Sequence, residues 1–325
     1  MRYLQSSAVI FVIFVASGCV ISGKIQPTVD PGATVDISPL WEEVVELASR
    51  NMFYGPGGSE LAPDTSTPFT FIRADQTGYS PGYDVRAADG LEWSVKLGPE
   101  AQTEVAVSRI LWALGYHQPP TYYVTSWTMT GQQQGSQLGA RFRPKLTDRE
   151  VVGEWDWYEN EFLHTRPFKG LVVINVMLNN WDWKTSNNKI YDLDGERVYV
   201  VQDLGASLGK TSYPRALGWL PMRGIGQGSR NNLEDFEEQG FIEGVEGDRI
   251  KFVYRGIHRS LIDMLTPADV LWAVDRMARL SDAQWDDIFR AAGYPEDQRR
   301  RYVAKIKSKV AQGLALKELP RWAAE

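Results

Sequence analysis

The order of the predicted elements constrains the fold of this chain more than any other feature, because its two halves differ in kind. The first half contains short β-like runs separated by turn residues, at 69–74, 82–86, 91–97, 122–129 and 138–146. One helix is predicted among them, over residues 100–114, with Gly115 positioned to end it. The pattern therefore predicts an α+β protein with a small antiparallel β-rich N-lobe, residues 38–146, and a mainly helical C-lobe, residues 147–325.

The predicted C-lobe begins its regular structure with an apolar helix over 168–179. A hairpin follows from 189–191 and 197–201, and the clearest later helices cover 267–280, 282–292 and 295–316. A further helix is expected near the start of the N-lobe, because Ser38 suits an N-cap and Pro39 suits the first helical position. Its apolar stripe would consist of Leu40, Val44, Val45 and Leu47.

Composition excludes several classes of function. The chain has 325 residues, 43% of them hydrophobic, which is typical of a folded globular protein. Its net charge of −6 argues against a general nucleic-acid binder, which needs a basic face, so no nucleic-acid partner is expected. One cysteine and three histidines exclude an internal disulfide and argue against a zinc cluster.

Residues 1–19 have the features of an export signal. Arg2 precedes an apolar run over 8–16, which is too short to span a bilayer and suits the core of a signal peptide. Small residues then precede Cys19, as in a bacterial lipoprotein signal, which is cut before a cysteine that becomes lipidated. Residues 20–37 contain glycine and proline without periodicity, and we expect a flexible tether.

This resemblance implies an exported protein of the cell envelope, periplasmic or at the cell surface, that is anchored to the membrane through the lipid on Cys19. An ordinary secretory signal and an uncleaved anchor are the alternatives. Arg2 disfavours the uncleaved anchor, because positive residues stay inside and send the following chain out.

A polar loop after the apolar helix has the residue types that phosphoryl transfer requires. Asp182, Lys184 and Asn187 lie in this loop, and the strand that leaves the following hairpin ends at Asp203. Phosphoryl transfer needs a carboxylate for the hydroxyl proton, oxygen ligands for a metal and a lysine to offset phosphate charge. Mg²⁺ prefers such hard oxygen donors, so the hairpin could hold the metal from both sides.

The first half of the chain offers complementary residues. Lys96 lies on the strand at 91–97, and Glu104 follows eight residues later on the predicted helix. A buried lysine needs a carboxylate partner, and such a pair would direct the ammonium group toward nucleotide phosphates. The loop between the first two strands contains Gly78, Ser80 and Gly82, and glycines there would let backbone N–H groups approach phosphate oxygens.

Over about residues 69–210 the sequence resembles the protein-kinase-like fold, and within it the HipA-like and phosphatidylinositol-3/4-kinase-like group. The matching motifs are Val95-Lys96, Glu104 on a helix that ends at Leu114-Gly115, the Asp182-to-Asn187 loop and Asp203-Leu204-Gly205. The chain departs from conventional protein kinases at Trp181, where they have arginine, and in lacking the Gly-x-Gly-x-x-Gly form of the loop.

The resemblance implies a role for each of these residues. Lys96 would bind the α- and β-phosphates of ATP, and Glu104 would anchor Lys96. Asp182 would be the catalytic base and Lys184 would contact the γ-phosphate. Asn187 and Asp203 would bind Mg²⁺ or Mn²⁺. The implied partners are the nucleotide and an acceptor hydroxyl on a protein, lipid or sugar.

Two alternatives to a kinase remain open. An exported domain sits where ATP is scarce, so the main alternative is a non-catalytic, pseudokinase-like lipoprotein that binds a ligand or partner. A carbohydrate platform would instead require an exposed tryptophan row, whereas packing within the C-lobe predicts buried tryptophans. The tryptophans concerned are Trp155, Trp157, Trp181 and Trp183.

Overall fold

The computed structural model describes residues 35–75, 80–132, 134–212, 215–216, 220–221 and 227–318. The predicted signal peptide with Cys19, most of the tether, and Gly78 lie outside these ranges. Among the helices within them, none combines the length and apolar character needed to cross a membrane.

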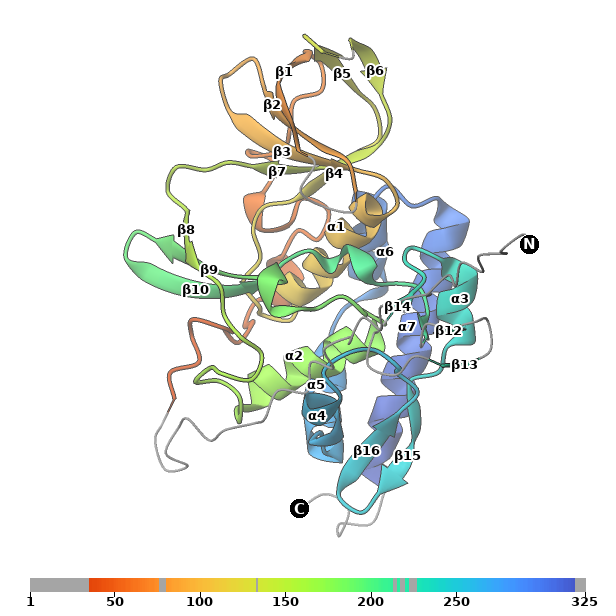
Figure 1. Ribbon diagram of the computed structural model, residues 1–325. Helices are drawn as coiled ribbons and strands as arrows, with labels where there is room; N and C mark the ends of the chain where they lie inside the picture. Colours follow the sequence, from red (N-terminus) through yellow and green to blue (C-terminus); the bar gives the residue numbers. More distant parts are fainter. Residues whose placement is uncertain are drawn as a thin grey trace, which may run out of the picture.

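A seven-stranded sheet forms one end of the molecule (Figure 1). Its strands run in the order β4-β7-β3-β2-β1-β5-β6, and all neighbours are antiparallel except β1 and β5. The strands are β1 (Phe69–Asp75), β2 (Gly82–Arg86), β3 (Glu92–Leu97), β4 (Tyr122–Val124), β5 (Trp127–Thr130), β6 (Gly135–Gln137) and β7 (Ala140–Pro144).

Alternation along β3 and β7 gives the sheet one apolar and one polar face. Trp93 and Val95 are buried in an apolar cluster with Phe142, whereas the residues between them point the other way, because successive side chains of a strand alternate. The antiparallel register places Lys96 opposite Arg141 on this polar face. The sequence pattern of these two strands therefore gathers cations on one side of the sheet.

Helix α1 (Glu100–Ala113) packs against the sheet and is buried along nearly its whole length. It matches the predicted helix, and Gly115, two residues after its last residue, has a φ of +99°. A Cβ at this position would lie 2.0 Å from the backbone oxygen of Glu42, so no other residue fits without a shift of the chain.

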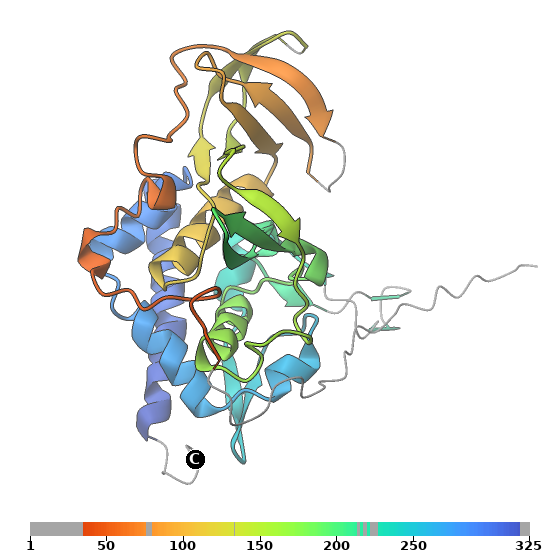
Figure 2. The same cartoon turned by 90° about the vertical axis from the view of Figure 1, so that its left-hand side faces the viewer.

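Most of the remaining helices lie at the opposite end of the molecule, as Figures 1 and 2 show. They are α2 (Arg166–Met177), α3 (Leu233–Glu238), α4 (Arg259–Asp263), α5 (Pro267–Met277), α6 (Asp282–Ala291) and α7 (Glu296–Leu314). Helix α2 is mostly apolar, is buried over most of its length and packs against α5. Capping boxes at Thr266 and Ser281 fix the first turns of α5 and α6.

A three-stranded sheet of β8 (Glu150–Gly153), β9 (Asn188–Leu193) and β10 (Glu196–Val201) lies beside α1 and α2 in Figure 1. The predicted hairpin is confirmed, with Asp194 and Gly195 both at positive φ in its turn. Three two-stranded sheets complete the described β-structure. They pair β11 (Thr211–Ser212) with β14 (Gln227–Gly228), β12 (Arg215–Ala216) with β13 (Leu220–Pro221), and β15 (Ile242–Glu246) with β16 (Arg249–Phe252). The 3-10 helices are η1 (Leu47–Ser49), η2 (Gly55–Gly57), η3 (Thr185–Asn187), η4 (Leu204–Ala206) and η5 (Ala315–Glu318).

The prediction of a helix that begins at Ser38-Pro39 is wrong. The described chain there forms turns, an isolated bridge from Trp41 to Tyr116, and η1. Its internal backbone hydrogen bonds are confined to single turns, and it also bonds to the end of α1, since the Glu42 N–H donates to the Gly115 oxygen at 3.0 Å. The apolar stripe is nevertheless used, because Leu40, Val44 and Leu47 are buried, while Val45 is exposed.

Two other expectations need correction. The run at 122–129 divides into β4 and β5, and only β4 pairs with β7, so the predicted antiparallel pair holds for part of its length. The region before α5 was expected to be mostly helical, yet it contains the β15–β16 hairpin. The α+β class itself is confirmed.

Candidate functional site

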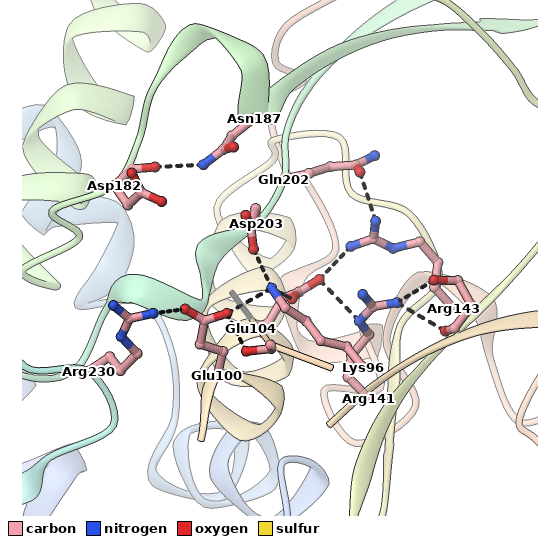
Figure 3. Close-up of polar contacts among 12 residues, drawn as sticks. Lys96, Glu100, Glu104, Arg141, Arg143, Asp182, Asn187, Gln202, Asp203 and Arg230 are labelled. Atoms are coloured by element: carbon pink, nitrogen blue, oxygen red, sulfur yellow. Dashed lines mark hydrogen bonds and ion pairs between the residues drawn. The ribbon is translucent and has the colours of Figure 1, made fainter. Parts of the chain in front are cut away.

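Lys96, near the end of β3, contacts carboxylates from two other segments (Figure 3). Its Nζ lies 3.1 Å from Glu100 Oε2 and 3.2 Å from Glu104 Oε2, both on α1, and it pairs with Asp203 Oδ1 just after β10. We call these four residues the Lys96 cluster. Burial by itself lowers the pKa of Lys96, but the three carboxylates outweigh it and raise the pKa above its ordinary value. The ammonium group is therefore held charged and in place.

Glu104 is shared between Lys96 and two arginines of β7. Its Oε1 lies 2.6 Å from Arg143 Nη2 and 3.2 Å from Arg141 Nε. Burial by itself raises the pKa of Glu104, but these three cations together hold the pKa below its ordinary value. Arg143 also donates to Gln202 Oε1 at 2.7 Å, next to Asp203 in the chain. Glu104 is thus an ionised, fully buried anchor for one wall of the site.

Glu100 connects the Lys96 cluster to two further segments. Its Oε2 accepts from Ser80 Oγ at 2.8 Å, and its Oε1 pairs with Arg230. The Arg230 guanidinium also stacks over the Trp181 ring, 4.6 Å from its centroid, beside the polar loop. Glu100 therefore joins the loop before β2, the strand β3 and the chain before α3.

The polar loop lies next to the Lys96 cluster, and Figure 3 shows Asp203 between the two. Asn187 Nδ2 donates to the backbone oxygen of Asp182 at 2.6 Å, and Lys184 Nζ lies 3.1 Å from Asp182 Oδ2. Burial raises the pKa of Asp182 above its ordinary value, and Lys184 opposes this only in part. The negative charges of Asp203 and Glu100 raise the pKa further. Such a carboxylate accepts a proton more readily than an ordinary aspartate.

Buried contacts fix the backbone of this loop. Trp183 is fully buried, and its Nε1 donates to the Tyr254 hydroxyl at 2.7 Å. His258 Nε2 lies 2.9 Å from the Trp183 backbone oxygen, and its Nδ1 lies 3.1 Å from the Tyr158 hydroxyl. Burial lowers the pKa of His258 to about 4, so the ring is neutral at pH 7 and donates from Nε2 to the loop.

Asp203 adopts a left-handed backbone conformation, with a φ of +54°, directly before η4. Aspartate tolerates this region better than most residues. Gly205 then passes very close to α1, since a Cβ there would lie 2.5 Å from the Cβ of Glu100. The Asp203-Leu204-Gly205 sequence thus brings an acidic side chain to Lys96 while the backbone fits against α1.

A cavity of about 230 Å³ lies at the Lys96 cluster, between the sheet and β10. It is mostly polar and is lined by Asp75, Ser80, Gly82, Ser94, Val95, Lys96, Glu104, Arg141, Arg143, Gln202 and Asp203. Gly82 is required for packing, because a Cβ there would lie 2.8 Å from the Val95 oxygen. Of the predicted phosphate-loop residues, Ser80 and Gly82 line the cavity, and Gly78 lies outside the described residues.

The donor set fits a magnesium ion that also binds phosphate. Within the described ranges no three His, Cys, Asp or Glu side chains gather as a metal site. Mg²⁺ bound to a nucleotide usually takes only one or two carboxylates, with phosphate and water oxygens for the rest. The carboxylate of Asp203 and the amide oxygen of Asn187 have the required chemistry, and the Asp203 side chain is 43% exposed.

Four residues of the site were not predicted from the sequence: Glu100, Arg141, Arg143 and Arg230. The two β7 arginines had a signal, because residues 140–144 alternate apolar and basic side chains, as a strand with one polar face does. Glu100 lies one helical turn before Glu104 and shares its face. No sequence pattern near Arg230 could have predicted its role, because only the tertiary fold brings it to α1.

The exposed tryptophan row that a carbohydrate platform needs is absent. Trp155, Trp157, Trp181 and Trp183 are all buried, none more than 8% exposed. Trp157 packs edge-on against Trp183, with ring centroids 4.7 Å apart. The packing interpretation is confirmed and the platform interpretation is wrong.

Neither a protein-family model nor a curated protein matches this sequence. Among solved structures, the chain is similar to the crystal structure of a Helicobacter pylori proinflammatory kinase, CtkA. The TM-score is 0.45 and the sequence identity is 13%, over 78% of this chain and 99% of that one.

Proposed function

We propose that this protein is an atypical, two-lobed, kinase-like phosphotransferase that moves the γ-phosphate of ATP to a hydroxyl group while tethered outside the cytoplasm. One observation carries the proposal. The Lys96 ammonium group contacts both Glu104 and Asp203, and Asp203 lies 107 residues after Lys96 in the chain. Helix α1 and the segment after β10 thus bring carboxylates to one partly buried cation of β3 beside a polar cavity, an arrangement that suits nucleotide phosphates.

The cluster's residues would divide the work of binding. Bound Mg²⁺·ATP would supply the phosphoryl group and part of the positive charge that the transfer requires. Lys96 would turn from Asp203 to the α- and β-phosphates, and Glu104 would keep its ammonium group in position. Asp203, freed from Lys96, and Asn187 would offer oxygen ligands to the metal.

Asp182 is the proposed base for the acceptor hydroxyl. Its raised pKa improves its ability to take a proton, and Lys184, which pairs with Asp182 in the structure, would contact the γ-phosphate. The acceptor class stays open, since protein, lipid and sugar hydroxyls all fit this chemistry. The tether and the lipid on Cys19 belong to the same proposal and rest on the sequence of residues 1–37.

Calorimetry with ATP and Mg²⁺ or Mn²⁺ tests the proposal. We expect the wild type to bind ATP only with the metal, and Asp203→Ala to bind at least about tenfold more weakly, because it loses a charged ligand. Asp248→Ala is the matched control, since Asp248 is an exposed aspartate of the β15–β16 turn. Absence of binding to the wild type would exclude the enzyme.

A non-catalytic binding lipoprotein is the second candidate. It is favoured by the small volume of the cavity, about 230 Å³, and by the three carboxylates that already form ion pairs with Lys96. Most ligand pockets are larger, about 300–1,000 Å³. Nucleotide binding without ATP hydrolysis or transfer to any protein, lipid or sugar acceptor would favour this candidate.

A further inference from the structure

The cavity at the Lys96 cluster lacks the apolar surface that a nucleotide base requires. Small-molecule pockets are lined mostly by hydrophobic and aromatic side chains, with a few polar groups for orientation. Among the described lining residues, Val95 alone has an apolar side chain, and it is 2% exposed and packs in the apolar cluster on the other face of the sheet. The other lining side chains are polar or charged, and Gly82 has none.

The register of the strands explains this lining. Residues directly opposite each other in antiparallel strands share one face of the sheet. Lys96 lies opposite Gly82 and Arg141, and Ser94 lies opposite Arg143. Because side chains alternate along a strand, the apolar residues between these positions face the core instead. A base that entered this cavity would therefore meet charged groups on its sheet side.

The same groups suit a chain of phosphates. Lys96, Arg143 and Asp203 come from β3, β7 and the end of β10, and they lie near one another (Figure 3). The side chains of Lys96 and Arg143 are 15% and 19% exposed, so a ligand can reach both. Charge-assisted hydrogen bonds from lysine or arginine to phosphate are roughly twice as strong as neutral ones.

The charges of the lining make a metal necessary for such a ligand. The cations are Lys96, Arg141 and Arg143, and the carboxylates are those of Asp75, Glu104 and Asp203. Because these charges balance, the lining alone does not attract a polyanion. Mg²⁺ held by the partly exposed Asp203 would add the positive charge that phosphates need. Binding should therefore require the metal whether or not the ligand has a base.

We propose, on the basis of the phosphotransferase function above, that the donor site recognises the phosphate chain and not the base, and therefore accepts inorganic polyphosphate in place of ATP. Transfer from tripolyphosphate would form one P–O bond to the acceptor hydroxyl, break one bridging P–O bond and release pyrophosphate. The hydroxyl proton would go to Asp182, as it would with ATP.

Calorimetry of the full chain with Mg²⁺ tests this donor class with ATP, GTP, tripolyphosphate and adenosine. We expect tripolyphosphate to bind no more than about fivefold more weakly than ATP or GTP, because a stacked base would add at least that factor. Adenosine should not bind. ATP or GTP that binds more than about fivefold tighter than tripolyphosphate would overturn the proposal and leave the phosphotransferase function intact. Failure of all four probes to bind would overturn both.

Arg143→Gln separates phosphate recognition from base recognition. Loss of this cation should weaken the binding of ATP and of tripolyphosphate by the same factor, at least about tenfold. Arg86→Gln is the matched control and should bind both as the wild type does, since Arg86 is an exposed β2 arginine, paired with Glu92, outside the lining. An effect of Arg143→Gln on only one ligand, or on neither, would overturn the proposal. The four probes on the wild type decide the question if Arg143→Gln does not fold.

Discussion

At the scale of single residues, the site is governed by how burial and neighbouring charges compete. Glu104 is fully buried and Asp182 is partly buried, and their pKa values move in opposite directions. Glu104 has three cations around it and stays ionised, whereas Asp182 has one lysine and two negative neighbours. The Glu104 carboxylate is therefore suited to anchor the neighbouring cations, and the Asp182 carboxylate is suited to accept a proton.

The raised pKa of Asp182 leads to a prediction about Asp182→Asn. The ionised carboxylate opposes folding at neutral pH, so the variant should melt at the wild-type temperature or higher. Phosphoryl transfer should fall about 100- to 10,000-fold, as expected for loss of a general base. Melting curves and transfer rates, compared with Asp248→Asn, check both parts. A clear loss of stability or an unchanged rate would contradict this role.

His258 predicts a specific pH dependence of stability. Its pKa is about 4 in the folded protein and 6.5 ordinarily, so the unfolded chain binds the extra proton between these values. Stability should therefore be fully present above pH 6.5 and fall by on the order of 3 kcal/mol as pH drops toward 4. Denaturant titrations from pH 7 to 4 measure this loss.

His258→Asn is the comparison for that titration. Asparagine tolerates the left-handed backbone at this position, where φ is +59°. The variant should be less stable at pH 7 and should lose less stability on acidification than the wild type. Parallel curves for the two proteins would show that another group titrates in this range.

At the scale of elements, the site depends on how closely η4 packs against α1. Gly205 allows this approach, because a Cβ would lie 2.5 Å from the Cβ of Glu100, whose position on a rigid helix cannot easily change. The contact determines where Asp203 meets Lys96. The geometry of the site is thus set by helix packing as well as by the polar contacts.

Gly205→Ala should separate these two elements. We expect a loss of about 1–3 kcal/mol in unfolding free energy, typical of overpacking, and a weaker affinity for ATP with Mg²⁺. Gly195→Ala is a partial control, because its Cβ would meet open space although its φ is also unfavourable for alanine. It should cost stability without affecting nucleotide affinity. Normal ATP binding by Gly205→Ala would mean that the η4 contact does not position Asp203.

Elements with local signals were predicted well, and those with distant partners were not. Gly115 ends helix α1, and Asp194-Gly195 turns the β9–β10 hairpin, so local residues suffice to define both elements. The segment after Ser38 has helical spacing, but Gly115 offers it a better backbone partner. The β15–β16 hairpin had a turn signal at Gly247-Asp248 that the pattern of nearby helices concealed.

At the scale of the whole molecule, Lys96, Glu104 and Asp203 were predicted because their order along the chain is itself informative. Other residues of the site, such as Arg230, which pairs with Glu100, reach it by a path of the chain that no local pattern reveals. The proposed lipid anchor, Cys19, is far in the sequence from every residue of the site. This separation makes the anchoring hypothesis testable without disturbing the site.

Cys19→Ser should move the protein from the membrane fraction to the soluble fraction of the cell envelope, because it removes the only sulfur available for lipidation. The nucleotide affinity of the released protein should match that of the wild type. Fractionation followed by immunoblotting measures the change, and Ser17→Ala serves as a neighbouring control. Retention of Cys19→Ser in the membrane would instead support an uncleaved anchor.

Helix α1 supplies two of the carboxylates that hold Lys96, Glu100 and Glu104. Nine residues after Glu100, the same helix buries Arg109, which donates to the backbone oxygens of Tyr54 at 2.9 Å and Thr121 at 2.5 Å. One rigid helix therefore connects the carboxylates at the nucleotide side with backbone contacts on its far side. A substitution that loosens the Arg109 contacts should change the position of both carboxylates and thereby reach the proposed nucleotide site.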